Sequence, residues 1–211
     1  MEWGFKDHIE KGKPPKSGDV VDAAVAGIEE ELKDVPASEV QWGKDDNPAK
    51  VKDDSVRMLT AYDPFRVKIK PAAVEKSFEI GFSNTDYKLI GREDLVTKDK
   101  AVVDHKTAGK SAPEDAAEKS EQLGVYNLDE PEAKSLELHV LVRTKEAKVQ
   151  ILKSPPRSPA ERRSLLENIG KVATLMKAGI FPKIIEGAPG SPCSWCGMYE
   201  ACRGRKPKWK E

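Results

Sequence analysis

Apolar residues follow two different periods along the chain, and the change between them separates a helical region from a strand-like one. Residues 19–32 carry apolar side chains on one face of a helix, after a Gly- and Pro-rich break at residues 12–18 that ends a shorter helical start. Residues 36–55 are polar and predict a long loop, and the segment "SVRMLTAY" predicts one more helical piece.

From Phe65 the pattern becomes strand-like. Four short runs rich in β-branched and aromatic residues, separated by the turn residues "SN" and "TKDK", are "FRVKIK", "AVEKSFEI", "DYKLIGREDLV" and "KAVVDHKT". Two further strands are expected at "SLELHVLVRT" and "KVQILKS". Between these sets, Ser111 and Glu114 form a capping box that predicts a helix to about Leu128, and a last helix is expected from Pro159 to Gly179.

This order of elements predicts an α/β or α+β core with a central mixed sheet flanked by helices. We expect a single domain over residues 1–211. Within it, residues 1–60 form an N-terminal helical part, residues 65–153 the sheet core, and residues 159–211 a C-terminal helix with a cysteine-containing appendage.

Charge and hydropathy limit the possible partners. The 36 basic and 36 acidic side chains cancel, so a nucleic acid would have to be bound by a local basic patch and not by the field of the whole protein. No apolar run approaches the roughly 18 residues needed to cross a bilayer, and the N-terminus lacks an apolar signal core. We therefore expect a cytoplasmic protein with no membrane partner.

Two acidic residues end neighbouring strand-like runs, and a lysine follows the second. Asp94 closes "LIGRED", while Asp104 lies two residues before Lys106 in "VVDHKT". A hairpin would bring the two carboxylates together, and converging carboxylates suit Mg²⁺ or Mn²⁺. Lys106 would point to the same side of its strand as Asp104, where it could orient a water molecule and offset phosphate charge. Alternatively, these charges only mark solvent-facing strand ends.

Five motifs in order resemble the RecB-type branch of the PD-(D/E)XK nuclease superfamily, close to CRISPR-adaptation nucleases and stand-alone phage or bacterial exonucleases. The matching residues are Gly4 and His8, Glu75, Gly91 and Asp94, Asp104 with Lys106 and Thr107, and Gln122 with Tyr126. The resemblance implies a restriction-endonuclease-like core. His105 replaces the usual Tyr of D-Y-K-T, and Glu93 replaces an apolar residue.

Roles for these residues follow from the resemblance. It implies that His8, Asp94 and Asp104 bind the metal together with the backbone carbonyl of His105, and that Lys106 is the catalytic lysine. Asp94 and Asp104 thereby belong to the catalytic set, whereas Glu75, Gln122 and Tyr126 support the site or contact DNA. His8 could instead be an ordinary surface histidine, Tyr126 a core residue and Gln122 a surface residue.

Three cysteines near the C-terminus form a C-x2-C-x5-C cluster, made of Cys193, Cys196 and Cys202. Thiolates at this spacing favour Zn²⁺ or an iron–sulfur cluster. The resemblance implies a [4Fe-4S] cluster, although the family's first cysteine is missing and the fourth ligand is not identified. The alternative is three reduced cysteines in a vestigial motif.

Three classes of function remain open from the sequence. The first is a metal-dependent DNA exonuclease acting on ends or single strands in a bacterial cell or phage-infected host, with end trimming in CRISPR adaptation as the nearest alternative. Recombination or CRISPR-adaptation proteins would then be partners. The second is a non-catalytic DNA-binding module that retains the fold. The third is a metal-knuckle protein whose chemistry lies in its cysteines.

Overall fold

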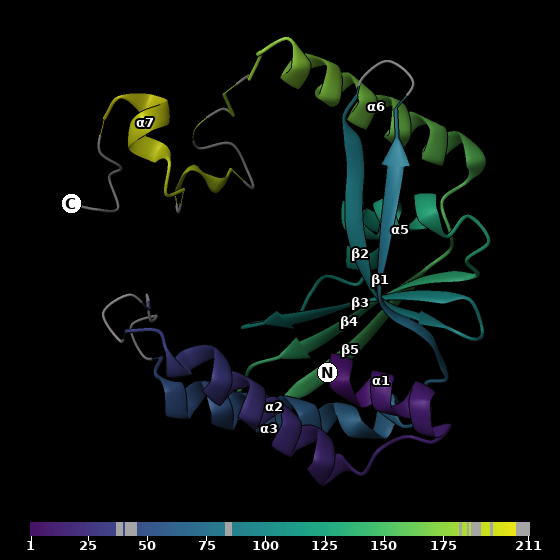
Figure 1. The fold of residues 1–211 in the computed structure, drawn as a ribbon, viewed down its shortest axis with the longest axis vertical. Helices are drawn as coiled ribbons and strands as arrows, with labels where there is room; N and C mark the ends of the chain where they lie inside the picture. Colours follow the sequence, from purple (N-terminus) through teal and green to yellow (C-terminus); the bar gives the residue numbers. More distant parts are fainter. Residues whose placement is uncertain are drawn as a thin grey trace.

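A five-stranded mixed sheet forms the centre of the protein in the computed structural model, which describes residues 1–36, 40, 46–82, 86–181, 183–184, 186, 191–194 and 196–205 (Figure 1). Its strands are β1 (Pro71–Gly81), β2 (Lys88–Thr97), β3 (Ala101–Ala108), β4 (Ser135–Val142) and β5 (Lys148–Ser154), in that order across the sheet. Neighbours are antiparallel except β3 and β4, which are parallel. The predicted mixed sheet is confirmed.

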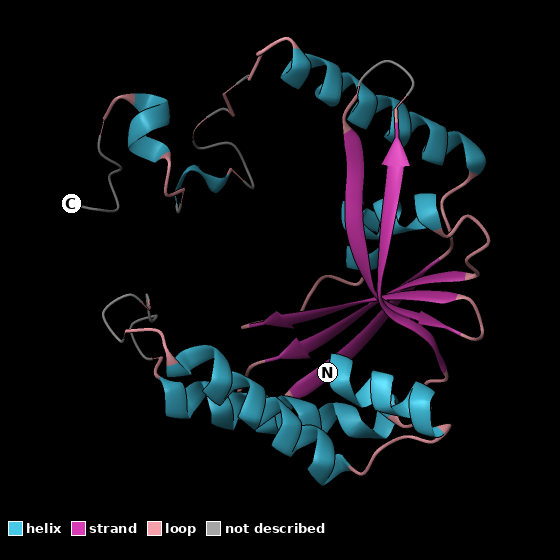
Figure 2. Ribbon diagram, in the orientation of Figure 1, coloured by secondary structure: helices cyan, strands magenta, loops and turns pink. Residues whose placement is uncertain are grey.

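Helices cover both faces of this sheet (Figure 2). The N-terminal helices are α1 (Glu2–Lys11), α2 (Ser17–Lys33) and α3 (Pro48–Arg66), and they are followed along the chain by α4 (Ala116–Lys119), α5 (Glu121–Asp129), α6 (Pro159–Lys177), the 3₁₀ turn η1 (Pro192–Ser194) and α7 (Tyr199–Arg203). In the described part of the chain, no helix combines the length and apolar character of a membrane span.

Strand β3 supplies side chains to two separate cores by simple alternation. Val103 packs with Phe5 of α1 and Tyr62 of α3, whereas Val102 packs with Leu123 and Tyr126 of α5. Successive side chains of a strand point to opposite faces, so Asp104 and Lys106 lie on the α5 side. His105 lies on the α1 and α3 side, where its ring stacks on Phe5.

The sheet divides between β2 and β3. These strands pair through Leu95 with Val103 and Val96 with Val102, whereas the pairing of β1 with β2 extends along both strands to Gly81 and Lys88. Beyond the short pairing, β1 and β2 stand apart from β3, β4 and β5 as a separate arm (Figure 1). Asp94 is therefore the first residue of β2 past the pairing with β3.

Gly91 of β2 lies under the ring of Phe78 on β1. A Cβ at position 91 would lie 2.3 Å from Phe78 Cζ, far inside van der Waals contact. The Phe78 ring in turn packs edge-on against Tyr126, with centroids 6.2 Å apart. The motif glycine is thus needed for the packing of β1 and β2 against α5.

Some helices and strands begin or end at other residues than the sequence predicts. Helix α3 begins at Pro48, after Asn47 accepts a hydrogen bond from Lys50 N, so the predicted loop over 36–55 is too long. The strand predicted at "FRVKIK" is wrong, because its first residues end α3 and β1 begins only at Pro71. The cap predicted at Ser111 is also wrong: Ser120 caps α5 by accepting from Leu123 N. The "SN" turn lies outside the described residues.

Candidate active site

A continuous chain of contacts joins the D-x-K segment of β3 to the Q-x-x-x-Y segment of α5. Lys106 Nζ lies 3.0 Å from Asp104 Oδ1 and 2.9 Å from Oδ2, and it donates a hydrogen bond of 2.7 Å to Gln122 Oε1. Gln122 Nε2 donates to the Tyr126 hydroxyl at 2.6 Å. The lysine ammonium is therefore held between a carboxylate and an amide oxygen.

Asp104 is the buried end of this chain. Its side chain has 0% exposure, and its Oδ2 accepts no hydrogen bond despite the nearby ammonium. Burial raises the pKa of Asp104, Lys106 opposes that rise, and the negative charge of Asp94 adds to it. Burial likewise raises the pKa of Tyr126 to about 12, so its phenol stays protonated. A cation bound at Asp104 would relieve the burial cost of the carboxylate.

Asp94 reaches the same point of β3 from the neighbouring strand. Its Oδ2 accepts a hydrogen bond of 2.8 Å from the backbone N–H of His105. Glu75 lies on β1 between residues that pair with β2 on either side of Asp94, and it has a left-handed backbone with φ 50°, which is unusual for a glutamate. Burial and the charges of Glu2 and Asp94 raise the pKa of Glu75.

The acidic residues fit a divalent cation, since oxygen ligands are what Mg²⁺ and Mn²⁺ prefer. The observation that supports the fit is the buried Asp104 oxygen without a hydrogen bond, next to a second carboxylate that raises its pKa. Asp94 and Asp104 would hold the ion. It would supply a Lewis acid and an activated water molecule.

His8 does not join the acidic residues. It lines a small cavity with Lys70, Pro71 and Lys98, at the start of β1. This end of β1 lies about 13 Å along the strand from Glu75. The start of α1 is the end near the site, because Met1 lines a cavity with His105 and Lys106. Helix α1 runs away from the site, so His8 lies about 9 Å beyond Glu2 along the helix axis. Among the described residues His8 has no contact with Asp94 or Asp104, and its role as a metal ligand stays a prediction.

His105 has a buried imidazole in an aromatic setting. Its ring stacks on Phe5 and meets Tyr62 and His139 edge-on, with centroids 5.7 Å and 5.5 Å away. Burial lowers the pKa of His105 to about 3, so the ring is neutral near neutral pH. Tyr62 and His139 are buried polar residues that the motif comparison does not single out; the signal in the sequence was a histidine within the apolar run "LELHVLV".

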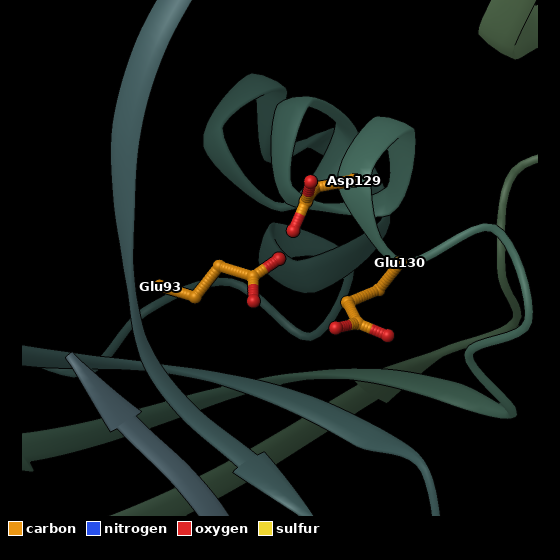
Figure 3. Close-up of side chains that lie close together, drawn as sticks. All are labelled: Glu93, Asp129 and Glu130. Carbon is orange, nitrogen blue, oxygen red and sulfur yellow. The ribbon is translucent and has the colours of Figure 1, made fainter. Parts of the chain in front are cut away.

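A second acidic cluster lies beside the first, and Figure 3 shows its three side chains pointing toward one another. Glu93, Asp129 and Glu130 are the residues within the described part of the chain that form a set of three or more metal-ligand groups within 4.8 Å. The Lys76 ammonium already lies among them, 2.6 Å from Asp129 and 3.7 Å from Glu93, and it also contacts Glu130. The spacing of these three carboxylates suits a cation, and the Lys76 ammonium is the cation that lies there.

A cavity of about 640 Å³ lies between α2, α3 and the end of β3. Ile28, Met58 and Leu59 are among its apolar lining, and His105, Lys106 and Thr107 form its β3 side. A smaller cavity of about 350 Å³ shares Met58 and Thr107 with it and extends to Arg143. Together they make a mostly apolar recess beside the end of β3, with the Arg143 guanidinium in its smaller part.

The cysteine segment is described without Trp195, and no disulfide joins its cysteines within the described residues. Arg203 Nη2 lies 3.6 Å from Cys193 Sγ, and Ser191 together with Arg203 lowers the pKa of the Cys193 thiol. Within the described residues, the three cysteines do not form a set of metal-ligand groups within 4.8 Å. A zinc or iron–sulfur site at Cys193, Cys196 and Cys202 stays a prediction.

Comparisons with known proteins identify the family and the fold. A family model described as the PD-(D/E)XK nuclease superfamily matches residues 2–203. No curated protein matches the sequence significantly. The crystal structure of a candidate exonuclease from Eubacterium rectale has a TM-score of 0.54 and 12% identity, over 90% of this chain and 74% of that chain. The crystal structure of SSO0001 has a TM-score of 0.45 and 19% identity, over 97% and 96%. The first likeness shows a shared fold.

Proposed function

The chain belongs to the PD-(D/E)XK nuclease superfamily, and on this premise we propose that it is a metal-dependent deoxyribonuclease that degrades DNA from ends or single strands. Asp94 and Asp104 would hold Mg²⁺ or Mn²⁺ through their carboxylates. The bound ion would polarise the scissile phosphate and lower the pKa of the attacking water. Hydrolysis of a phosphodiester is the reaction that this combination of groups supports.

The contact chain from Asp104 through Lys106 to Gln122 and Tyr126 is the observation that carries this proposal. It joins the residues of two motifs that are distant in sequence into one polar group. An ammonium held between a carboxylate and an amide oxygen is oriented before substrate arrives, so it loses little freedom when it meets the charge of a transition state. Lys106 would orient the attacking water and stabilise charge on the phosphate.

The apolar recess supports an unpaired strand as the substrate. Bases within a duplex are stacked and paired, whereas an unpaired base can leave the stack and enter an apolar pocket. The larger cavity, at about 640 Å³, is within the size range of small-ligand sites and is lined by Lys106 and Thr107. A base in this cavity would place its own phosphate near the end of β3. End trimming in CRISPR adaptation is one setting for such an activity.

The test is cleavage of end-labelled single- and double-stranded DNA by the full chain, with Mn²⁺ and with a chelator. We expect metal-dependent shortening of the single strand, and its loss in Asp104→Asn with DNA binding retained. Asp22→Asn, an exposed position on α2, is the matched control. Unchanged cleavage by Asp104→Asn would overturn the assignment of Asp104, and binding without cleavage by the native chain would favour a non-catalytic module.

A further inference from the structure

Three loops meet at the end of the sheet where the β2–β3 turn lies. Lys98, in this turn, donates its backbone N–H to the carbonyl of Lys70, just before β1, at 2.8 Å. Lys134, just before β4, donates its backbone N–H to the carbonyl of Lys100 at 2.8 Å. All four side chains are exposed, and these four lysines together form a lysine patch.

Lys100 occupies its place in the turn at a conformational cost. Its φ is 63°, in the left-handed region where glycine and asparagine are the usual residues. Its backbone N–H donates to the Thr97 carbonyl at 2.9 Å, which closes the turn. The turn therefore presents a charged side chain at a position where glycine would be easier to accommodate.

Positive charge exceeds negative charge in these loops. In the described part of the chain, none of the four ammonium groups has an ion-pair partner, whereas Lys177, which is also exposed, lies 3.2 Å from Asp86. Asp99 and Glu132 lie in the same loops, so two negative charges stand against four positive ones. The whole chain is neutral, so this local excess is complementary to a polyanion.

A small cavity lies within the patch. It has a volume of about 350 Å³, and Lys70, Lys98 and His8 are among its lining. None of the described residues that line it is acidic, and the buried Nδ1 of His8 has no hydrogen-bond partner among them. A hollow with two lysines and no carboxylate suits an anion and does not suit a divalent cation.

The patch and the acidic pair lie on the same hairpin. Lys98 comes four residues after Asp94 on β2, and Lys100 comes four residues before Asp104 on β3. At about 3.3 Å per residue, the two sites are about 13 Å apart along the strands. Phosphates of a stacked strand are about 3.4 Å apart along its axis, so this separation corresponds to about four nucleotides.

We propose that the lysine patch binds phosphates of the DNA strand beyond the cleavage point, with Lys70 and Lys98 contacting one phosphate together. The inference rests on the proposed function, which supplies DNA as the ligand. In a chain without net charge, the patch provides the local basic surface that binding of a nucleic acid requires. Contacts to phosphates carry no base information, so this binding is independent of sequence.

The test is the salt dependence of binding between full-length Asp104→Asn protein and a labelled single strand, without divalent metal. In the Asp104→Asn background, Lys98→Gln combined with Lys100→Gln should reduce the slope of log affinity against log salt by about 1.4, because each lost contact to a single strand accounts for about 0.7. Lys171→Gln combined with Lys177→Gln, at exposed positions of α6, is the matched control. It removes the same charge and should leave the slope unchanged.

An unchanged slope in the patch variant, an equal fall in the α6 control, or no DNA binding at all would overturn the inference. If the first patch variant fails to fold in a thermal melt, Lys70→Gln combined with Lys134→Gln removes the same charge from the other two loops. Binding is measured without cleavage. A chain with a patch-dependent slope and no cleavage would refute only the proposed nuclease function, and cleavage by the native chain with an unchanged slope would refute only the patch.

Discussion

Two buried carboxylates on neighbouring strands each have a lysine partner, and they are arranged for different purposes. Asp104 on β3 and Glu93 on β2 both have 0% side-chain exposure. Asp104 contacts Lys106, whose second partner is the neutral amide of Gln122. Glu93 faces Lys76, whose other partners are the carboxylates of Asp129 and Glu130.

The two lysines differ in the number of carboxylates that share their charge. Lys76 is shared by three acidic residues, so its charge is fully used within the protein. Lys106 shares its charge with one contacting carboxylate and lines the recess where a substrate could lie. A buried acid–lysine pair is therefore weak evidence of catalysis, and the neighbours of the lysine distinguish a candidate active site from a structural cluster.

The largest expected effect is a loss of cleavage rate when Lys106 is replaced. Lys106→Met should lower the rate of Mn²⁺-dependent cleavage by about 10²- to 10³-fold, because the group that offsets phosphate charge is lost. The measurement is the single-turnover rate on end-labelled single-stranded DNA, with a thermal melt to show that the variant is folded. A rate within threefold of the native chain would remove Lys106 from the proposed mechanism.

The matching change in the second cluster should affect stability. Lys76→Met leaves three carboxylates without their common cation; since Lys76 is partly exposed, we expect a loss of about 1–3 kcal/mol in the free energy of unfolding. Urea denaturation measures this loss. Cleavage by the folded variant should stay within threefold of the native rate. A large loss of activity in a stable Lys76→Met protein would contradict the contrast between the two lysines.

The recess offers a third comparison, since it adjoins Lys106. Leu59→Trp should fill part of the cavity and lower cleavage of single strands about tenfold, equivalent to about 1.4 kcal/mol. Val172→Trp, on the exposed side of α6, is the control for the added indole. Equal rates for the two variants would exclude the cavity from substrate binding.

The ionisation of Glu93 allows the second cluster to be compared at two pH values. Burial raises the pKa of Glu93 from 4.5 to about 7, with Lys76 opposing the rise. The folded protein therefore favours protonated Glu93. The contribution of this protonation to the free energy of unfolding is complete below about pH 4.5 and is lost as the pH rises through 7. Glu93→Gln should gain about 3 kcal/mol over the native chain at pH 8 and little at pH 4.5. Urea denaturation at both pH values tests this, and a pH-independent difference would contradict it.

Local rules of sequence predict much of this molecule. The alternation of a strand places Asp104 and Lys106 on one side, and the four-residue spacing of a helix places Gln122 and Tyr126 together, so these contacts depend on short stretches of chain. The start of α3 was also readable, because Asn47 followed by Pro48 is a typical helix start. The polar composition of residues 36–55 instead indicated a loop over the start of α3.

What the sequence could not supply is the packing of distant elements. The order of motifs does not fix the direction of α1, so it could not show that His8 lies at the other end of β1. Glu93 was visible as a departure from an apolar position, yet its partners come from β1 and the end of α5. The hydrogen bond between Tyr62 and His139 likewise joins residues from α3 and β4.

The division of the sheet after Leu95 and Val96 gives the candidate metal a mechanical meaning. Hydrogen bonds of the sheet do not hold Asp94 to Asp104, because Asp94 lies past the pairing of β2 with β3. Across this gap, the backbone N–H of His105 donates a hydrogen bond to the Asp94 carboxylate. An ion held by both carboxylates would act as a clasp between the β1–β2 arm and the rest of the sheet, so that assembling the site and stiffening the protein would be one event.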